Sequence, residues 1–184
     1  MYSNNFTSTI PESLYNLTKL QYLAIYSNKL TGTISTSIGN FLSVDRLDFS
    51  DNRLTGSIPT EIGYLTQMTI VFLDHNHLSG HIPNDVSLLT NLEVLCFNDN
   101  SLGGTIPTAI GNLQNLGELS LGGNLLSGSI PSEIGNLTKL ENLLLPTNML
   151  TGPIPHMIGN MTNLKFINCK FNGLGGSLPV ELFQ

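Results

Sequence analysis

Apolar and polar positions recur along this chain with a period of 24 residues. An asparagine marks each period, an apolar residue follows two positions later, and in every period but the first a glycine stands two positions further on. The asparagines are Asn4, Asn28, Asn52, Asn76, Asn100, Asn124, Asn148 and Asn172. No insertion or deletion interrupts this register, so the chain consists of internal structural repeats.

One period, residues 44–67, shows which elements the pattern predicts. Inward and outward side chains alternate over residues 44–50, as in a short strand with one buried face. Asn52 ends this strand, and its amide can bond backbone groups of adjacent turns. Gly56 permits a backbone conformation that a Cβ would hinder, and a second short extended piece follows. Pro59 sets φ for a tight turn, after which the spacing of the apolar residues predicts a single 3₁₀ turn.

A single period cannot bury its own apolar residues, so consecutive periods must stack on one another. Dividing 184 residues by 24 gives about 7.7 turns, enough for one continuous core. We therefore expect an α/β-type repeat solenoid with a concave parallel sheet. Short second strands and 3₁₀ turns are expected to complete each period on the convex side.

Composition excludes several classes of protein. Only 11% of the residues are charged and the net charge is −6, which argues against a nucleic-acid partner because phosphate binding needs a basic surface. A hydrophobic fraction of 40% is too high for a disordered chain. The two cysteines cannot form a disulfide scaffold.

Residues 116–137, LGELSLGGNLLSGSIPSEIGNL, carry the repeat in its clearest form. The repeat resembles the plant-specific class of leucine-rich repeats, and L-x-G-x-I-P is its distinguishing segment. That class occurs in ectodomains of receptor-like kinases, in receptor-like proteins and in polygalacturonase inhibitors. The resemblance implies a right-handed superhelix that acts outside the cell or at its surface. It also implies a non-catalytic recognition module without a cofactor, whose concave face contacts a peptide, a protein ligand or a co-receptor.

The ends of the chain lie inside the repeat. The sequence opens at Asn4 without the preceding strand and closes just after Leu182, whereas ectodomains of this class begin with a cysteine-paired cap. We expect residues 1–184 to form a single solenoid that is open at both ends and belongs to a longer array. No signal peptide begins the chain, and no apolar run approaches the length of about 20 residues that a membrane span needs.

Variation between the repeats is greatest at the outward strand positions, so these positions are the candidate ligand-binding residues. Acidic side chains gather at the middle of this face, aromatic side chains stand at both ends, and a merely solvated sheet is the alternative. The candidates are Tyr22, Tyr26, Arg46, Asp48, Asp51, Ile70, Phe72, Asp74, Val94, Asn98, Asp99, Glu118, Leu144, Phe166 and Lys170. Aromatic residues and arginine often anchor interfaces, and contiguous exposed apolar side chains mark binding surfaces.

No motif indicates an enzyme or a metal site. The sequence lacks a nucleophile elbow, a phosphate-binding loop and a zinc-binding helix motif. His75, His77 and His81 cluster in sequence, but their predicted directions diverge. Cys96 is expected to be exposed on the concave face and Cys169 to point inward. Three turns separate them by roughly 14 Å, beyond the reach of a disulfide.

Four N-x-[S/T] sequons make glycosylation candidates of Asn5, Asn16, Asn136 and Asn160. Three of the four share one phase on the predicted convex side. Two alternatives to a receptor-like module stay open. The first is an inhibitor of a secreted cell-wall hydrolase. The second is an ice-binding protein, suggested by stacked hydroxyl residues such as Thr31 and Thr33.

Overall fold

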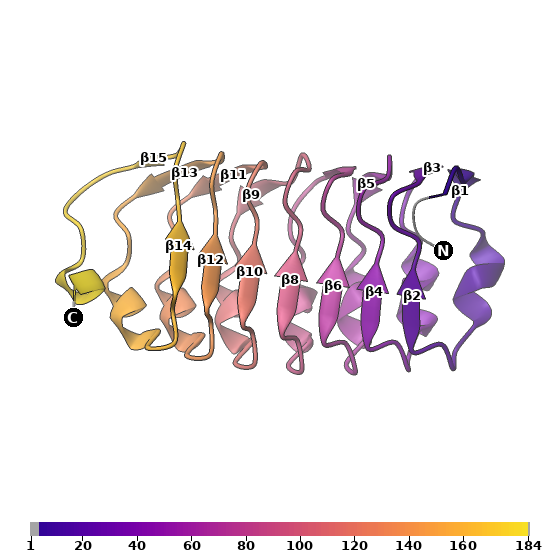
Figure 1. The fold of residues 1–184 in the computed structure, drawn as a ribbon, viewed down its shortest axis with the longest axis horizontal. Coiled ribbons are helices and arrows are strands. Elements are labelled where there is room, and N and C mark those ends of the chain that lie inside the picture. Colours follow the sequence, from indigo (N-terminus) through magenta and orange to yellow (C-terminus); the bar gives the residue numbers. More distant parts are fainter. Residues whose placement is uncertain (1–3, 184) are drawn as a thin grey trace.

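The protein is described by a computed structural model that covers residues 4–183. Figure 1 shows one stack of turns in which short strands stand side by side, and within the described residues these form a seven-stranded sheet. The sheet is entirely parallel, and its strands follow one another in chain order. Its strands are β2 (Tyr22–Ala24), β4 (Arg46–Asp48), β6 (Ile70–Phe72), β8 (Val94–Cys96), β10 (Glu118–Ser120), β12 (Asn142–Leu144) and β14 (Phe166–Asn168). We call the side of this sheet that faces away from the core the sheet face; it is the predicted concave face.

A second set of strands runs along one edge of the stack (Figure 1). These strands are β1 (Thr7–Thr9), β3 (Lys29–Thr31), β5 (Thr55–Ser57), β7 (His77–Ser79), β9 (Gly103–Thr105), β11 (Leu125–Gly128), β13 (Met149–Gly152) and β15 (Gly173–Leu174). They form two two-stranded sheets and one four-stranded sheet. Only isolated bridges join the three pieces, Thr33 with Thr55 and His81 with Gly103.

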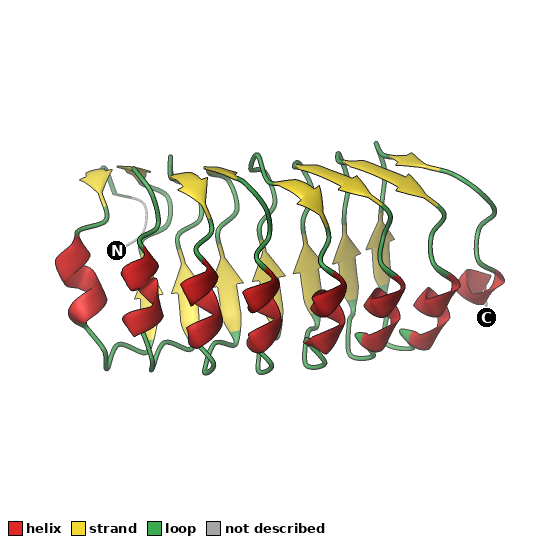
Figure 2. Ribbon diagram, turned by 180° about the vertical axis from the view of Figure 1, so that it is seen from behind, coloured by secondary structure: helices red, strands yellow, loops and turns green. Residues whose placement is uncertain are grey.

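Eight 3₁₀ turns lie behind the seven-stranded sheet, as Figure 2 shows. They are η1 (Glu12–Asn16), η2 (Thr36–Asn40), η3 (Thr60–Tyr64), η4 (Asn84–Leu88), η5 (Thr108–Asn112), η6 (Ser132–Asn136), η7 (His156–Asn160) and η8 (Val180–Phe183). A proline precedes six of the first seven turns, with φ between −61° and −71°. The ring holds φ near −65° and so favours the entry into the turn.

The exception is Ser35, which precedes η2 and adopts the same extended conformation with φ at −69°. Its hydroxyl accepts a hydrogen bond from the Ser37 backbone N–H at 3.1 Å, as an N-cap does. Its own N–H, which a proline would lack, lies 3.4 Å from the Tyr15 hydroxyl oxygen. Tyr15 is fully buried and occupies the position that glycine holds in most later turns. The missing proline and the buried tyrosine are therefore linked by one contact.

The asparagine at the end of each sheet strand joins consecutive turns, as the sequence predicts. The Asn52 side-chain carbonyl accepts a hydrogen bond from Leu30 N–H at 3.0 Å, and its amide donates to the Ile25 carbonyl at 3.1 Å. The same amide also donates to two carbonyls of its own turn. The pattern recurs at Asn76, Asn124 and Asn148, which are all buried. The apolar residues between sheet and 3₁₀ turns pack as one core cluster.

Candidate ligand-binding face

The register of the parallel sheet aligns its outward side chains in columns, because each strand pairs with the next without an offset. The first column contains Tyr22, Arg46, Ile70, Val94, Glu118, Asn142 and Phe166. The second column contains Ala24, Asp48, Phe72, Cys96, Ser120, Leu144 and Asn168. The scaffold therefore holds the variable residues of successive turns next to one another.

Exposure along these columns differs between the ends and the middle. Tyr22 and Phe166 are 56% and 54% exposed at the two ends of the first column. Ile70, Phe72 and Leu144 are half-buried against their neighbours in the sheet. The face therefore offers isolated aromatic side chains at its ends and a closely packed surface of mixed polarity between them.

The expectation that Cys96 is exposed is wrong. Its side chain points to the sheet face, but it is only 6% exposed. Its thiol lies 3.6 Å from Glu118 Oε1 as a hydrogen-bond donor. Burial, followed by the nearby charge of Glu118, raises the pKa of the Cys96 thiol far above its usual range. Cys96 is therefore an unreactive thiol, and its charged neighbour is the group that a ligand would meet.

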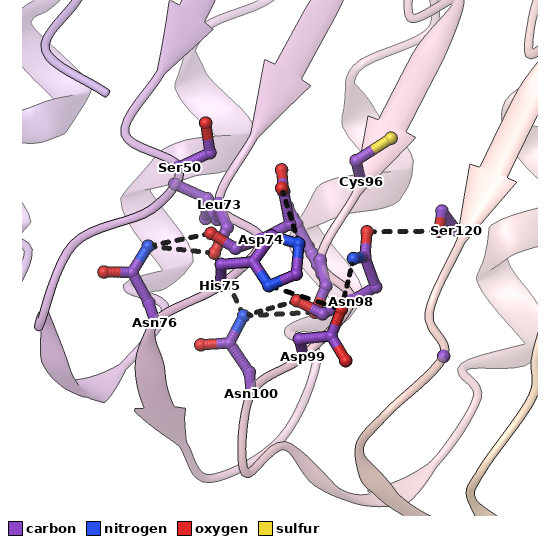
Figure 3. Close-up of polar contacts among 12 residues, drawn as sticks. Ser50, Leu73, Asp74, His75, Asn76, Cys96, Asn98, Asp99, Asn100 and Ser120 are labelled. Carbon is purple, nitrogen blue, oxygen red and sulfur yellow. Dashed lines mark hydrogen bonds and ion pairs between the residues drawn. The ribbon is translucent and has the colours of Figure 1, made fainter. Parts of the chain in front are cut away.

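A chain of polar contacts links three strands at the centre of the face (Figure 3). The Ser120 hydroxyl donates to Asn98 Oδ1 at 3.1 Å, and the Asn98 amide donates to Asp99 Oδ2 at 2.8 Å. The same carboxylate oxygen lies 3.4 Å from His75 Nδ1, and His75 Nε2 lies 3.9 Å from Asp74 Oδ2. The contacts hold the acidic groups in place, as a preorganised binding surface requires.

Asp74 is the carboxylate that the sheet buries most effectively among these acidic groups. Burial raises its pKa, and the charges of Asp48 and Asp99 act in the same direction. A backbone hydrogen bond and the neighbouring His75 oppose this effect. A raised pKa means that the charged form is destabilised in the free protein, so a cationic partner would relieve part of that cost.

In each turn, the residue just after the last outward position has a left-handed backbone conformation. This column contains Ser27, Asp51, His75, Asp99, Gly123, Thr147 and Phe171, with φ between 50° and 63°. Asp51 and Asp99, both predicted site residues, therefore stand at the rim beyond the strand ends, where they are exposed. His75 belongs to the same column and lies between two carboxylates. Its place at a strand end followed from the repeat register, whereas its contact with Asp99 in the next turn did not.

Among residues 4–183, no group of three or more histidine, cysteine or acidic side chains is arranged to hold a metal ion. His75 contacts the acidic centre, whereas the His81 ring lies 3.3 Å from the Gly103 carbonyl on the second set of strands. Cys96 and Cys169 are both free. Within the same described part, no helix has the length and apolar character required to cross a membrane.

A hollow of about 630 Å³ lies along the edge of the sheet where the chain enters strands β2, β4, β6 and β8. Gln21, Asp45, Thr69 and Glu93 line it, and each immediately precedes a sheet strand. These residues are not among the predicted ligand-binding residues, which were chosen from the outward positions within the strands. Their regular spacing of 24 residues was the sequence signal that could have placed them on one edge of the sheet.

The fold and the face can now be compared with known proteins. Four segments match the family model described as Leucine Rich Repeat: residues 19–41, 43–65, 91–113 and 115–137, together half of the chain. This chain is a leucine-rich repeat protein. No curated protein sequence matches it at a significant level.

Solved receptor structures share the fold of this leucine-rich repeat protein. A TDR receptor matches it with a TM-score of 0.97 and 32% identity, over 98% of this chain and 31% of the receptor. The Arabidopsis receptor kinase HAESA, solved with the peptide hormone IDA and the co-receptor SERK1, matches with a TM-score of 0.94 and 36% identity, over 97% of this chain and 30% of that chain. The chain thus spans about a third of these receptor structures. The predicted solenoid and its likeness to plant leucine-rich repeat receptors are confirmed.

A plant ice-binding protein also matches, with a TM-score of 0.64 and 24% identity over 94% of this chain and 71% of that one. At this identity the match concerns the fold alone. The leucine-rich repeat scaffold is therefore common to proteins of different function, and function has to be argued from the sheet face.

Proposed function

We propose that this leucine-rich repeat protein is a non-catalytic recognition module that binds a peptide or protein carrying positive charge on its sheet face. The observation that carries the proposal is the hydrogen-bonded acidic centre formed by Asp74, Asp99 and their neighbours on the outward side of a fixed scaffold. Asp48 and Glu118 extend the same negative region within the sheet. Clustered charge of one sign attracts a partner of the opposite sign and discriminates against others.

The proposed setting is a receptor-like protein at the cell surface, or a secreted one. Similarity to HAESA, which was solved with a peptide hormone and a co-receptor, supports a peptide ligand and a second protein as partners. The sequons fit this setting. Asn16, Asn136 and Asn160 end the 3₁₀ turns η1, η6 and η7 and are exposed behind the sheet (Figure 2). Glycans there, like one on exposed Asn5, would leave the sheet face free; a mass loss on glycosidase treatment of secreted material tests this.

The ice-binding alternative receives less support from the geometry of the second set of strands. A flat array of hydroxyl groups requires a continuous row of strands, but this set is divided into three sheets. His81 stands at one of the junctions between them. The hydrolase-inhibitor alternative uses the same sheet face as the proposal, so it differs only in the identity of the protein partner.

The proposal is tested by selecting peptides from a random library on the whole chain and measuring their affinity at two salt concentrations. Replacing Asp48, Asp74 and Glu118 together by alanine should weaken binding and reduce its dependence on salt, because screening acts on the charges that are removed. We expect a loss of about tenfold or more.

The matched control replaces Asp45, Glu93 and Glu141 by alanine. This variant loses the same number of negative charges, but from the edge that precedes the strands. Its peptide affinity should stay within about twofold of the parent, since exposed charges that are remote from the ligand contribute little to binding. Equal losses in the two variants would mean that net charge governs binding, and unchanged affinity in the first would refute the acidic face.

A further inference from the structure

A hollow of about 310 Å³ opens on the sheet face at the ends of strands β8 to β14. Asn98, Asp99 and Ser120 line one side, and Leu144, Pro146 and Phe166 line the other. One side is therefore hydrogen-bonding and negatively charged, while the opposite side is apolar. Neither feature belongs to the repeat consensus, because all six residues stand at variable positions.

The hollow exists because one turn of the solenoid lacks two side chains. Gly122 and Gly123 stand where the neighbouring turns carry Asn98 with Asp99 and Pro146 with Thr147. A Cβ on Gly122 would lie 2.7 Å from Pro146 Cδ, and a Cβ on Gly123 would overlap the Asp99 carboxylate. Backbone alone thus forms the floor, and the side chains of the two adjacent turns lean over it as walls.

On the polar side of the hollow, one of the two carboxylate oxygens of Asp99 already accepts a hydrogen bond. Asp99 Oδ2 accepts the hydrogen bond from the Asn98 amide and lies close to His75. Asp99 Oδ1 is the atom that extends over Gly123, toward the floor of the hollow. Half of the Asp99 side chain is exposed, so the carboxylate can meet a donor that enters from the sheet face.

The apolar wall suits an aliphatic stem and a flat cation. Leu144 and Pro146 are half-buried hydrocarbon surfaces, and the exposed Phe166 ring stands beside them in strand β14. A guanidinium group binds carboxylates through a planar fork of N–H donors and also packs on aromatic faces. Its three methylene groups favour contact with apolar side chains.

We propose that this hollow binds an arginine side chain of the ligand, with the guanidinium group on Asp99 and the stem against Leu144 and Phe166. This assignment rests on the proposed peptide recognition and names the ligand residue that the face selects. Charge alone would admit lysine as well. Arginine is favoured because its planar fork of N–H donors matches the carboxylate and its cation is less strongly hydrated than an ammonium group.

The test uses a defined probe, N-acetyl-L-arginine methylamide, titrated into the ¹⁵N-labelled full chain. Backbone amide shifts should be largest at Gly122, Gly123 and Thr147, which border the hollow. N-acetyl-L-citrulline methylamide, which has nearly the same shape without the charge, should bind at least tenfold more weakly. Equal binding of the two probes, or shifts centred elsewhere on the chain, would overturn the assignment.

Paired variants assign the effect to the two walls. Asp99→Asn should weaken the arginine probe about tenfold, whereas Asp51→Asn, at the same left-handed position of another turn, should leave it within twofold. Phe166→Ala should weaken it about threefold by removing the aromatic wall. Tyr22→Ala, an equally exposed aromatic in the same column, should have no effect. Loss of probe affinity in a control variant would count against the hollow.

The outcome separates this inference from the proposed function. Selected peptides that lose affinity in the Asp48, Asp74 and Glu118 variant, yet contain no arginine and tolerate Asp99→Asn, would refute the arginine hollow and leave peptide recognition standing. An arginine probe that binds as described, while no selected peptide loses affinity in the Asp48, Asp74 and Glu118 variant, would support the hollow and refute peptide binding through those three acidic residues.

Discussion

The recurrent asparagines form a column of side-chain hydrogen bonds that connects neighbouring turns inside the solenoid. The side chain of Asn76 is buried and bonds four backbone groups, one N–H and three carbonyls, in two successive turns. The three carbonyls also accept hydrogen bonds from other groups: Asp74 from the Asp51 N–H, Phe49 from Asn52 and Leu73 from Asn100. The Leu54 N–H depends on the Asn76 side chain as its acceptor. The residue therefore acts as a fixed connector between turns, which explains why it recurs in every period.

We predict that Asn76→Ala lowers the free energy of unfolding by about 3 kcal/mol, because it removes four hydrogen bonds and leaves the buried Leu54 N–H without its side-chain acceptor. Asn91→Ala is the control, since the exposed Asn91 amide bonds only the Thr66 carbonyl. Its effect should stay below about 1 kcal/mol. Urea denaturation of both variants measures the difference, and equal losses would contradict the role of burial.

Asp74 should make the stability of the protein depend on pH. Its pKa is raised in the folded state, so the folded protein holds this proton more tightly than the unfolded chain does. Stability contributed by the protonated carboxyl is present at low pH and is lost as pH rises through the folded pKa.

We therefore predict that Asp74→Asn is more stable than the parent at neutral pH. The advantage should disappear as pH falls below the ordinary aspartate value of 3.8. Chemical denaturation across pH measures it, with Asp51→Asn as an exposed reference. An advantage that is constant with pH would show that the substitution acts through packing instead of through the charge.

The exposure of individual residues on the face was the part that the sequence predicted least well. Alternation correctly placed Cys96 on the outward side, but it carries no information on how far neighbouring side chains cover a small residue. Cys96 is flanked by Phe72 and Ser120 in the adjacent strands and contacts Glu118, which lies 22 positions away. Burial by side chains of adjacent strands depends on how the turns pack, so it cannot be predicted from the sequence of one turn.

At the scale of the elements, the repeat fixes where the chain must adopt a positive φ. The recurrent glycine, which lies within or just after each second strand from β3 onwards, has φ between 73° and 88° throughout. At Gly56 a side chain would also collide with the previous turn, as the Thr33 methyl group lies 2.7 Å from an ideal Cβ. Sequence analysis predicted this requirement from glycine recurrence alone, because the physical cause repeats with the sequence.

Neighbouring glycines of strand β9 allow a direct test. We predict that Gly104→Ala, with φ at 75° and its new Cβ overlapping the His81 ring, costs about 2 kcal/mol of stability. Gly103→Ala should be neutral or stabilising by about 0.5 kcal/mol, since its Cβ meets nothing closer than 3.9 Å. Thermal unfolding compares the two, and similar losses would contradict the conformational explanation.

Exceptions to the repeat were visible in the sequence, but their causes were not. Ser35 stands where most other turns carry the recurrent proline. Its reason is the contact with Tyr15, one turn earlier, together with its own cap on Ser37. Consensus reasoning treats positions independently, so it does not reveal that two departures in different turns compensate for each other.

For the whole molecule, architecture was predictable because each turn repeats the same local requirements and contacts only its neighbours. The hollow was not predicted, although Gly122 and Gly123 were visible as adjacent glycines at variable positions. Its walls come from the turns before and after, and their separation is set by stacking. The expectation that the solenoid continues into a longer array stays a prediction.

The central claim is that the sheet face, and not the side formed by the 3₁₀ turns, contacts the ligand. Photo-crosslinking tests it most directly: a selected peptide carrying benzoylphenylalanine is irradiated on the chain, and the adducts are located by mass spectrometry. We predict adducts within strands β4 to β14 and the rim residues that follow them. Adducts confined to the turns η1 to η8 would contradict the account.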